Sequence, residues 1–354
     1  MTSKNPLKIS IGMKLRSGPW GGSNQFGVAL AEYLEQRGHI VSFDLKSPDL
    51  DIIVLTDPRS GGASATYQQH DIMRYLIKTN WRALVVHRVN ECDERKGTTG
   101  VNAQLMAANN CADHTVFISH WLRDLFLKHG LDVADTSSVV LNGADQRIFH
   151  ANGYQRWNHR EKLRLVTHHW GGGWLKGFDI YQQLDHMLQA PTWKDRIDFT
   201  YIGNVPDGFS FRNTTYLEPQ HGDVLADSLR NHHVYLTASQ YEPAGMHHVE
   251  GALCGLPLLY RESGALPDYG DGFGVSFTME NFEQQLHTML ETYDDWVERM
   301  PVYRNTAERM CAEYYQLFLR LGEQRKRLLR KRTIQLKRPV WFAQMLWRNV
   351  RKRI

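Results

Sequence analysis

The sequence predicts an α/β protein made of two Rossmann-like domains with a ligand-binding cleft between them. The chain of 354 residues is longer than a single hydrophobic core usually supports. Two series of short apolar strands and amphipathic helices follow each other along it, separated by a polar stretch at residues 152–162. Its apolar content of 42% is typical of a globular protein.

The first series occupies residues 1–155. A strand at 7–13 leads through a glycine-containing loop into a helix at 24–37, whose apolar residues recur at helical spacing until Gly38 ends it. The remaining strands are predicted at residues 40–43, 52–56, 83–88, 115–118 and 139–141, and the remaining helices at 67–79, 101–110 and 119–129. Because helices separate most of the strands, we expect a parallel sheet.

The second series occupies residues 156–300. Its strands are predicted at 163–167, 198–202, 234–237 and 258–260, and its helices at 178–189, 224–231 and 249–253. Residues 282–321 have an almost wholly helical pattern, long enough to run back across the first domain. We assign residues 301–322 to this crossover helix and residues 323–354 to a basic amphipathic tail.

The basic tail differs in charge from the rest of the chain. Residues 324–354 contain twelve Lys or Arg and no Asp or Glu, which leaves 30 basic against 38 acidic residues elsewhere. Trp341, Trp347 and several leucines lie between these charges, as in helices that bind anionic membranes, where each cation contributes about 1 kcal/mol. A solvated helix is the alternative. Nucleic acid is not expected as a partner, because base-stacking side chains usually lie in a folded groove.

The sequence also indicates a compartment. No segment approaches the roughly 20 apolar residues of a membrane-spanning helix, and the first residues lack the pattern of a signal peptide. The cysteines are widely scattered and are expected to be reduced thiols: Cys92, Cys111, Cys254 and Cys311. We therefore expect a cytoplasmic protein that is peripheral on the inner face of the membrane.

Two carboxylates flank a loop of the second series. Glu242 follows the strand predicted at 234–237, and Glu250 lies eight positions later in the next helix. The loop between them contains Pro243 and Gly245. Open α/β sheets bind ligands at the carboxyl ends of their strands, and helix N-termini favour anions. The pattern therefore predicts a binding site rather than two unrelated surface acids.

Two glycine-containing loops suggest a phosphate site. Gly21 and Gly22 lie between the first strand and the first helix, and Lys176 precedes Gly177 at the start of another helix. Glycine lets a phosphate approach the backbone amides at such a helix start. Neither loop has the spacing of a dinucleotide-binding or ATP-binding motif. Facing each other from opposing domains, the two loops would form a cleft.

These residues resemble the retaining glycosyltransferases of the two-Rossmann GT-B architecture, in the group called family 4. The segment from Glu242 to Pro257 follows the two-glutamate signature of that family in full. Gly21, Gly22 and Lys176 fall where similar enzymes carry their equivalents, and the likeness extends to about residue 300. The resemblance implies a GT-B fold, with an acceptor-binding first domain, a donor-binding second domain and C-terminal helices that cross back.

The resemblance also implies transfer of a sugar from a nucleotide-diphosphate sugar to a glycan or lipid-linked acceptor, with retention at the anomeric carbon. Glu242 would bind hydroxyls of the donor sugar, and Glu250 would accept from the ribose hydroxyls. Lys176 would neutralise the leaving diphosphate. The other residues expected to contact the donor are Gly21, Gly22, Gly245, Met246 and His247. Neither a metal nor another cofactor is required in this scheme.

The chain departs from its relatives at one point. Many of them carry an arginine shortly after a strand where this chain has His168 and His169. His169 either donates to the phosphate in place of that arginine, or the contact is lost, or both rings are simply packed. In the first domain, His87 is the candidate catalytic residue at a strand end, with Asn90 as the alternative. Burial of His87 between strand and helix fits its position equally well.

Other reactions are less well supported. Asp49 and Asp51 have the Asp-x-Asp spacing of metal-dependent transferases, but they precede a strand of the first domain, far along the chain from the glutamates. The histidine pairs at 232/233 and 247/248 are adjacent, so their side chains diverge rather than converge on an ion. The alternatives are a sugar-nucleotide epimerase or phosphorylase of the same fold, and a catalytically silent sugar-nucleotide binding subunit.

Overall fold

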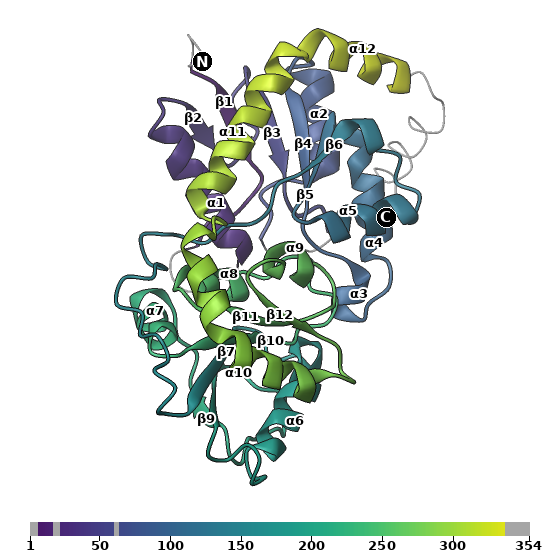
Figure 1. The fold of residues 1–354 in the computed structure, drawn as a ribbon. Coiled ribbons are helices and arrows are strands. Elements are labelled where there is room, and N and C mark those ends of the chain that lie inside the picture. The colour runs from purple at the N-terminus through teal and green to yellow at the C-terminus, as the bar shows by residue number, and fades with distance from the viewer. Residues whose placement is uncertain (1–5, 17–21, 60–63, 337–354) are drawn as a thin grey trace.

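The computed structural model describes residues 6–16, 22–59 and 64–336, with side chains to residue 332 (Figure 1). It contains two sheets of six parallel strands, one in each half of the chain. Helices cover the faces of both sheets, as a buried parallel sheet requires. The predicted α/β fold with two Rossmann-like units is confirmed.

The first sheet has the order β2-β1-β3-β4-β5-β6. Its strands are β1 (Lys8–Ile11), β2 (Ile40–Ser42), β3 (Ile52–Leu55), β4 (Leu84–Val89), β5 (His114–Phe117) and β6 (Ser137–Val139). Its helices are α1 (Gly22–Glu35), α2 (Gln69–Lys78), α3 (Asp93–Lys96), α4 (Val101–Ala108) and α5 (His120–Lys128). One core lies between this sheet and α1, and another lies under α2.

The second sheet has the order β12-β11-β10-β7-β8-β9. Its strands are β7 (Leu163–His169), β8 (Ile197–Gly203), β9 (Thr215–Leu217), β10 (Val234–Thr237), β11 (Leu258–Arg261) and β12 (Gly274–Phe277). Its helices are α6 (Phe178–Met187), α7 (Gly222–Arg230), α8 (His247–Leu253), α9 (Leu266–Gly270) and α10 (Phe282–Arg299). The strand order reverses between β7 and β10, so the crevice that binds ligands in such sheets opens at their carboxyl ends.

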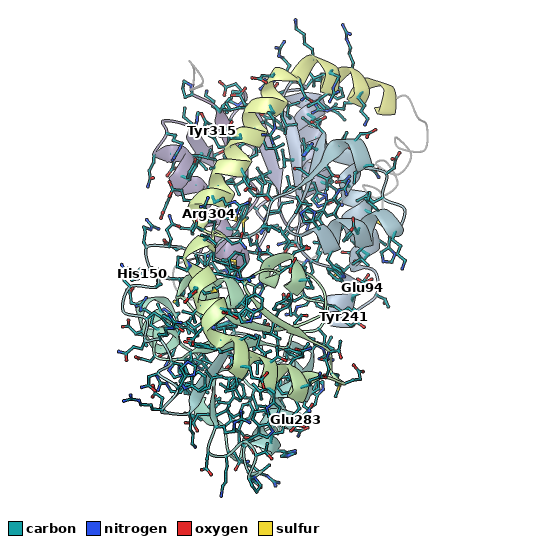
Figure 2. The ribbon with its side chains drawn as sticks, viewed as in Figure 1. Glu94, His150, Tyr241, Glu283, Arg304 and Tyr315 are labelled. Carbon is teal, nitrogen blue, oxygen red and sulfur yellow. The ribbon has the colours of Figure 1, made fainter. Side chains whose placement is uncertain are left out.

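The long helical region returns to the first domain, but it is not continuous. α10 ends at Arg299, a 3-10 turn follows at Met300–Val302, and α11 begins at Ala307 and ends at Glu323. Pro301 lacks the backbone N–H that a continuing helix would need. α11 then runs along α1, and the rings of Tyr314 and Phe26 lie 5.1 Å apart (Figure 1). Figure 2 shows Arg304 at the crossing and Tyr315 beside the first domain.

The first part of the basic tail is docked on the first domain. It forms α12 (Arg325–Leu336). The buried Arg332 donates from Nε to Asp113 at 3.0 Å and from Nη1 to the carbonyl of Trp81 at 2.6 Å. Arg325 donates to Asp51 at 2.9 Å. Two of the twelve basic residues are therefore structural, while residues 337–354 lie outside the described part of the chain.

No helix in the described ranges is long and apolar enough to cross a bilayer. The four cysteines are buried and unpaired with one another.

Candidate functional site

A cavity of about 600 Å³ lies between the two sheets, where the carboxyl ends of their strands face each other. Its first-domain wall includes the start of α1, the end of β4 and the segment after β6. Its second-domain wall includes the end of β7, the turn before α6 and the loop between β10 and α8. Residues of the predicted site that line the cavity are Gly22, His169, Lys176, Glu242, Gly245, Met246, His247 and Glu250.

Glu242 is a buried, ionised carboxylate. Its Oε2 atom accepts from Lys176 Nζ at 2.8 Å, and both of its oxygens lie 3.4 Å from Nε of Arg95 in α3. Burial alone would raise the pKa of this carboxyl, but the two cations outweigh it and hold the pKa at about 2. Glu242 therefore carries a full negative charge at neutral pH.

The loop that carries Glu242 is held in a strained conformation. Tyr241 has a φ of 50°, in the left-handed region that residues other than glycine rarely adopt. The carbonyl of Glu242 accepts from the amide of Ala265 at 2.7 Å. A Cβ on Gly264 would lie 2.4 Å from the amide nitrogen of Glu242, so this close packing requires glycine. Tyr241 lies at the level where the two domains meet (Figure 2). Strain of this kind is typical of residues that position a functional group.

Lys176 approaches Glu242 from the turn before α6. Gly177 follows it with a φ of 102°, and a Cβ there would lie 2.5 Å from the Cβ of Ala238. Only glycine therefore allows this turn to pack against the end of β10. Burial lowers the pKa of the Lys176 ammonium, while Glu242 opposes that shift. The structure places the candidate lysine and glutamate side by side.

Glu250 pairs with a histidine at the end of β7. His168 Nε2 lies 2.7 Å from Glu250 Oε2, and its Nδ1 lies 3.0 Å from the hydroxyl of Tyr235. Both Glu250 and His168 are buried. If the hydroxyl of Tyr235 donates to Nδ1, the ring proton of His168 lies on Nε2, which then donates to the carboxylate of Glu250. Glu250 was predicted from the sequence, whereas its partner was not.

His169 and His247 lie side by side, with ring centroids 4.5 Å apart. His169 Nε2 lies 2.8 Å from the hydroxyl of Tyr181, and His247 Nε2 lies 2.9 Å from the hydroxyl of Thr237. Burial lowers the pKa of both imidazoles well below their usual range, so both are neutral. His169 can therefore offer a ligand an N–H group but not the fixed charge of an arginine.

Two glycines bring the domains and their side chains into close contact. A Cβ on Gly22, at the start of α1, would lie 2.5 Å from Cγ of Met246 in the opposite domain. A Cβ on Gly245 would lie 2.3 Å from Cε1 of His247. The 14-residue helix α1 starts at this contact, so its N-terminus faces the cavity, which suits an anion. Gly21, also predicted here, lies outside the described residues.

Of the two placements that the sequence allowed for His87, the structure shows the buried one rather than the catalytic one. The side chain is fully buried, and its Nδ1 lies 2.9 Å from the amide oxygen of Asn109, on the face of the sheet that α2 covers. Burial lowers its pKa to about 4. It does not line the cavity, because successive residues of a strand point to opposite faces and Arg88 takes the cavity side. The alternative, Asn90, does line the cavity and donates to Ser23 Oγ at 2.9 Å.

The domain junction is built from hydrogen bonds beside the cavity. The side-chain oxygen of Asn142 accepts from Nη2 of Arg88 at 2.9 Å, and the backbone N–H of Asn142 donates to the hydroxyl of Tyr269 at 2.8 Å. That hydroxyl in turn donates to the carbonyl of Ile118 at 2.9 Å. Because Tyr269 belongs to α9 of the second domain, these bonds fix how the two walls of the cavity face each other.

The Asp-x-Asp pair lies away from the cavity. Asp51 precedes β3, at the amino end of the first sheet, and is bonded to Arg325, while Asp49 pairs with Lys8. Within the part of the chain that the structure describes, no three His, Cys, Asp or Glu side chains are grouped so that they could hold a metal ion.

No protein-family model and no curated protein sequence matches the chain. Its structure, however, is similar to several solved structures. Sucrose-phosphate synthase from Thermosynechococcus elongatus matches with a TM-score of 0.59 and 15% identity, over 90% of this chain and 99% of that one. The catalytic domain of starch synthase IV from Arabidopsis thaliana, bound to ADP and acarbose, gives 0.64 and 12%, over 90% and 100%.

HepE from Anabaena, in complex with UDP and glucose, matches with a TM-score of 0.57 and 14% identity, over 90% of this chain and 99% of that one. All three similarities extend over about nine tenths of this chain and almost the whole of the other, so they include both sheets. The chain therefore has the GT-B fold that these glycosyltransferases share.

Proposed function

We propose that this protein is a retaining glycosyltransferase that moves a sugar from a nucleotide-diphosphate sugar to a glycan or lipid-linked acceptor. The observation that supports this most strongly is the grouping of Glu242, Glu250 and Lys176 around one cavity between the two domains of a GT-B fold. Two acids eight positions apart reach that cavity together because a strained loop ends β10 and a short helix follows it.

Glu242 is the group that would bind the sugar. An ionised carboxylate accepts strong hydrogen bonds from hydroxyl groups, and this one is ionised because Lys176 and Arg95 stabilise its charge. Lys176 would face the diphosphate. Charge accumulates there as the glycosidic bond breaks, so a pre-positioned ammonium stabilises the transition state more than the bound donor. The first-domain helix α1 would support the same phosphates through its N-terminus.

Glu250 would hold the ribose through its two oxygens. His168 bonds one of these oxygens and orients the carboxylate, and the other oxygen would accept from a hydroxyl group. Gly245 and Met246 would contact the sugar or the phosphates through their amides. The neutral rings of His169 and His247 would then serve as short-range donors on the same wall.

The donor is proposed to be a nucleoside diphosphate hexose. HepE was solved with UDP-glucose, and starch synthase IV was solved with ADP. The wild-type chain should therefore be incubated with UDP-glucose, ADP-glucose and GDP-mannose in the presence of EDTA. We expect a rise in thermal stability with one of them, because ligand binding to the native state stabilises it by mass action.

Incubation of the protein with a labelled nucleotide sugar and an added glycan acceptor separates the transferase from the alternative functions. Labelled sugar on the acceptor supports the transferase. An epimerised nucleotide sugar or a sugar phosphate supports an epimerase or phosphorylase instead. Binding without turnover, equal in wild type and in Glu242→Gln, supports a silent binding subunit. A requirement for added Mn²⁺ would contradict the metal-independent scheme.

We also propose that the first domain docks on an anionic membrane on the cytoplasmic side, where a lipid-linked acceptor would lie. Four cations form one exposed face of α12: Lys326, Arg327, Arg330 and Lys331. Their spacing places them on the same side of the helix, opposite the buried Arg332. Such a face gains about 1 kcal/mol per cation near an anionic surface.

This docking is tested with the four exposed cations changed to Gln, in the full chain and in a chain ending at residue 336. Truncation before α12 would be a poor test, because Arg325 and Arg332 stabilise the domain. We expect the substitutions to release protein from vesicles of anionic phosphatidylglycerol while soluble turnover continues. The control changes the exposed Lys128 and Lys194 to Gln. Unchanged vesicle binding by the α12 variant would contradict the proposal.

A further inference from the structure

The first domain reaches across the cavity to the carboxylate at the centre of the second-domain wall. Arg95, in the one-turn helix α3, places its Nε atom 3.4 Å from each oxygen of Glu242. Lys176 bonds the same carboxylate from the second domain at 2.8 Å. Glu242 is thus held between two cations, and only one of them belongs to its own domain.

α3 is tied to the start of α4, with Asp93 making several of the bonds. Asp93 Oδ1 accepts from the amide of Val101 at 2.9 Å and from the hydroxyl of Thr98 at 3.0 Å, and its Oδ2 accepts from the amide of Asn102 at 2.9 Å. These bonds tie the turn to the start of α4. The backbone that carries Arg95 is therefore fixed to the first domain. Arg95 would move with that domain if the two domains moved apart.

The neighbouring charges of α3 are engaged elsewhere. Lys96 pairs with Glu91 at 3.0 Å, and Glu94 pairs with His129 at 3.2 Å. Within the described residues, the guanidinium of Arg95 has Glu242 as its one partner, and it is only partly exposed. A solvated surface arginine would not require a specific partner in the other domain, so this contact indicates a more specific role for Arg95.

We propose that Arg95 is a positioning residue for Glu242, which sets this carboxylate for the donor sugar only while the two domains are closed on each other. The inference rests on the proposed function, because it assigns Glu242 to the sugar. Opening of the cavity would separate Glu242 from Arg95 but not from Lys176, since Lys176 moves with its own domain. Sugar recognition is thereby coupled to closure.

The test compares Arg95→Gln and Arg95→Lys with the matched control Lys96→Gln, all in the full chain. The neighbouring Lys96 has the same charge and lies in the same turn, but it does not touch Glu242. For the nucleotide sugar that the wild type uses, we expect Arg95→Gln to lower kcat/KM about tenfold, the usual scale for one hydrogen bond to a charged group. Arg95→Lys should recover part of this loss, and Lys96→Gln should resemble the wild type.

The second measurement is binding of the corresponding nucleoside diphosphate, which has no sugar. We expect its affinity to be unchanged in Arg95→Gln, because Arg95 acts through Glu242 rather than on the phosphates. In a Glu242→Gln background, Arg95→Gln should have no further effect on nucleotide-sugar affinity, since the carboxylate that it positions is gone.

Equal losses of nucleoside diphosphate and nucleotide sugar affinity in Arg95→Gln would overturn the inference, and so would fully additive effects with Glu242→Gln. Unchanged turnover in Arg95→Gln, with an active wild type, would overturn it while leaving the proposed function intact. A wild type that binds no nucleotide sugar would contradict the proposed function itself.

Discussion

The two walls of the cavity are built in different ways. On the second-domain wall, Glu242 and Glu250 come from one strand-loop-helix segment, and Lys176 comes from one further turn. The first-domain wall is assembled from separate segments that include Gly22, Asn90 and Asn142, each far from the others in sequence. Residues that come from one segment leave a pattern in the sequence, whereas a wall made from widely separated segments depends on the whole fold.

The walls also differ in electrostatics. The second-domain wall combines buried carboxylates with neutral histidines, so its charges are fixed by burial and pairing. The first-domain wall contributes a helix N-terminus and Arg95. We therefore expect changes on the second wall to abolish chemistry, and changes on the first wall to weaken closure and sugar recognition.

The largest effect is expected from Lys176→Met, which removes the cation and keeps most of the side chain. Turnover should fall about 1,000-fold, because a pre-positioned charge at the leaving group is lost. The variant should also melt at a lower temperature, since Glu242 is left buried with Arg95 as its remaining cation. Lys194→Met, at an exposed position, is the control. A drop of less than tenfold would show that the second wall is not the catalytic one.

The next effect concerns pH and arises from buried histidines in both domains. The folded-state pKa of His87 is about 4, below its usual 6.5, because of burial. The unfolded chain therefore binds the proton first, and stability is lost as the pH falls from about 6.5 to about 4. At about 1.4 kcal/mol per pKa unit, His87 accounts for about 3 kcal/mol of that loss.

Urea unfolding of the wild type and of His87→Asn between pH 4 and 7 measures this contribution. The variant should show a smaller fall in unfolding free energy over that range, whatever its stability at pH 7. His248, whose pKa burial lowers to about 3, should give the second domain a similar dependence. Parallel curves for wild type and variant would contradict the neutral, buried state of His87.

A smaller effect is expected at Gly245. A Cβ there would overlap the ring of His247, so Gly245→Ala must shift that ring or the loop. Turnover should fall by roughly 10-fold to 30-fold, because misplacement of about 1 Å is costly at an active site. Gly173→Ala is the matched control, since a Cβ there meets nothing within 4 Å. Equal activities of the two variants would show that the loop geometry does not matter.

The smallest effect tests the contact between the walls. Gly22→Ala places a methyl group against Met246, whose flexible side chain can partly move away. We expect donor affinity to fall a few-fold, on the scale of about 1 kcal/mol for modest overpacking. The double variant Gly22→Ala with Met246→Ala should recover affinity. No recovery would mean that Gly22 acts through its own backbone rather than through this contact.

Much of the second domain could be predicted from the sequence. Its strands are mostly apolar, and the segment from Glu242 to Glu250 contains the turn residues Pro243 and Gly245. Local sequence patterns are therefore enough to predict the strands and this loop. The partner of Glu250 could not be predicted, because His168 becomes its neighbour only through the pairing of β7 with β10. β9 and β12 were not predicted, because β9 is largely exposed and has no apolar run, and β12 begins at a glycine in a glycine-rich segment.

The first-domain wall was harder to predict for physical reasons. The phase of β4 decides whether His87 or Arg88 faces the cavity, and a fully buried strand gives no alternation from which to read that phase. Arg95 lies in a single turn that is held by Asp93 rather than by hydrophobic periodicity. Long-range geometry alone brings its guanidinium to Glu242.

The most direct test is the anomeric configuration of the product made from an α-linked nucleotide sugar, followed by ¹H NMR at early times. A site in which Glu242 binds the sugar and Lys176 stabilises the leaving diphosphate predicts an α-linked product, formed by the wild type and lost in Glu242→Gln. A β-linked product, or equal product formation by Glu242→Gln, would contradict the account.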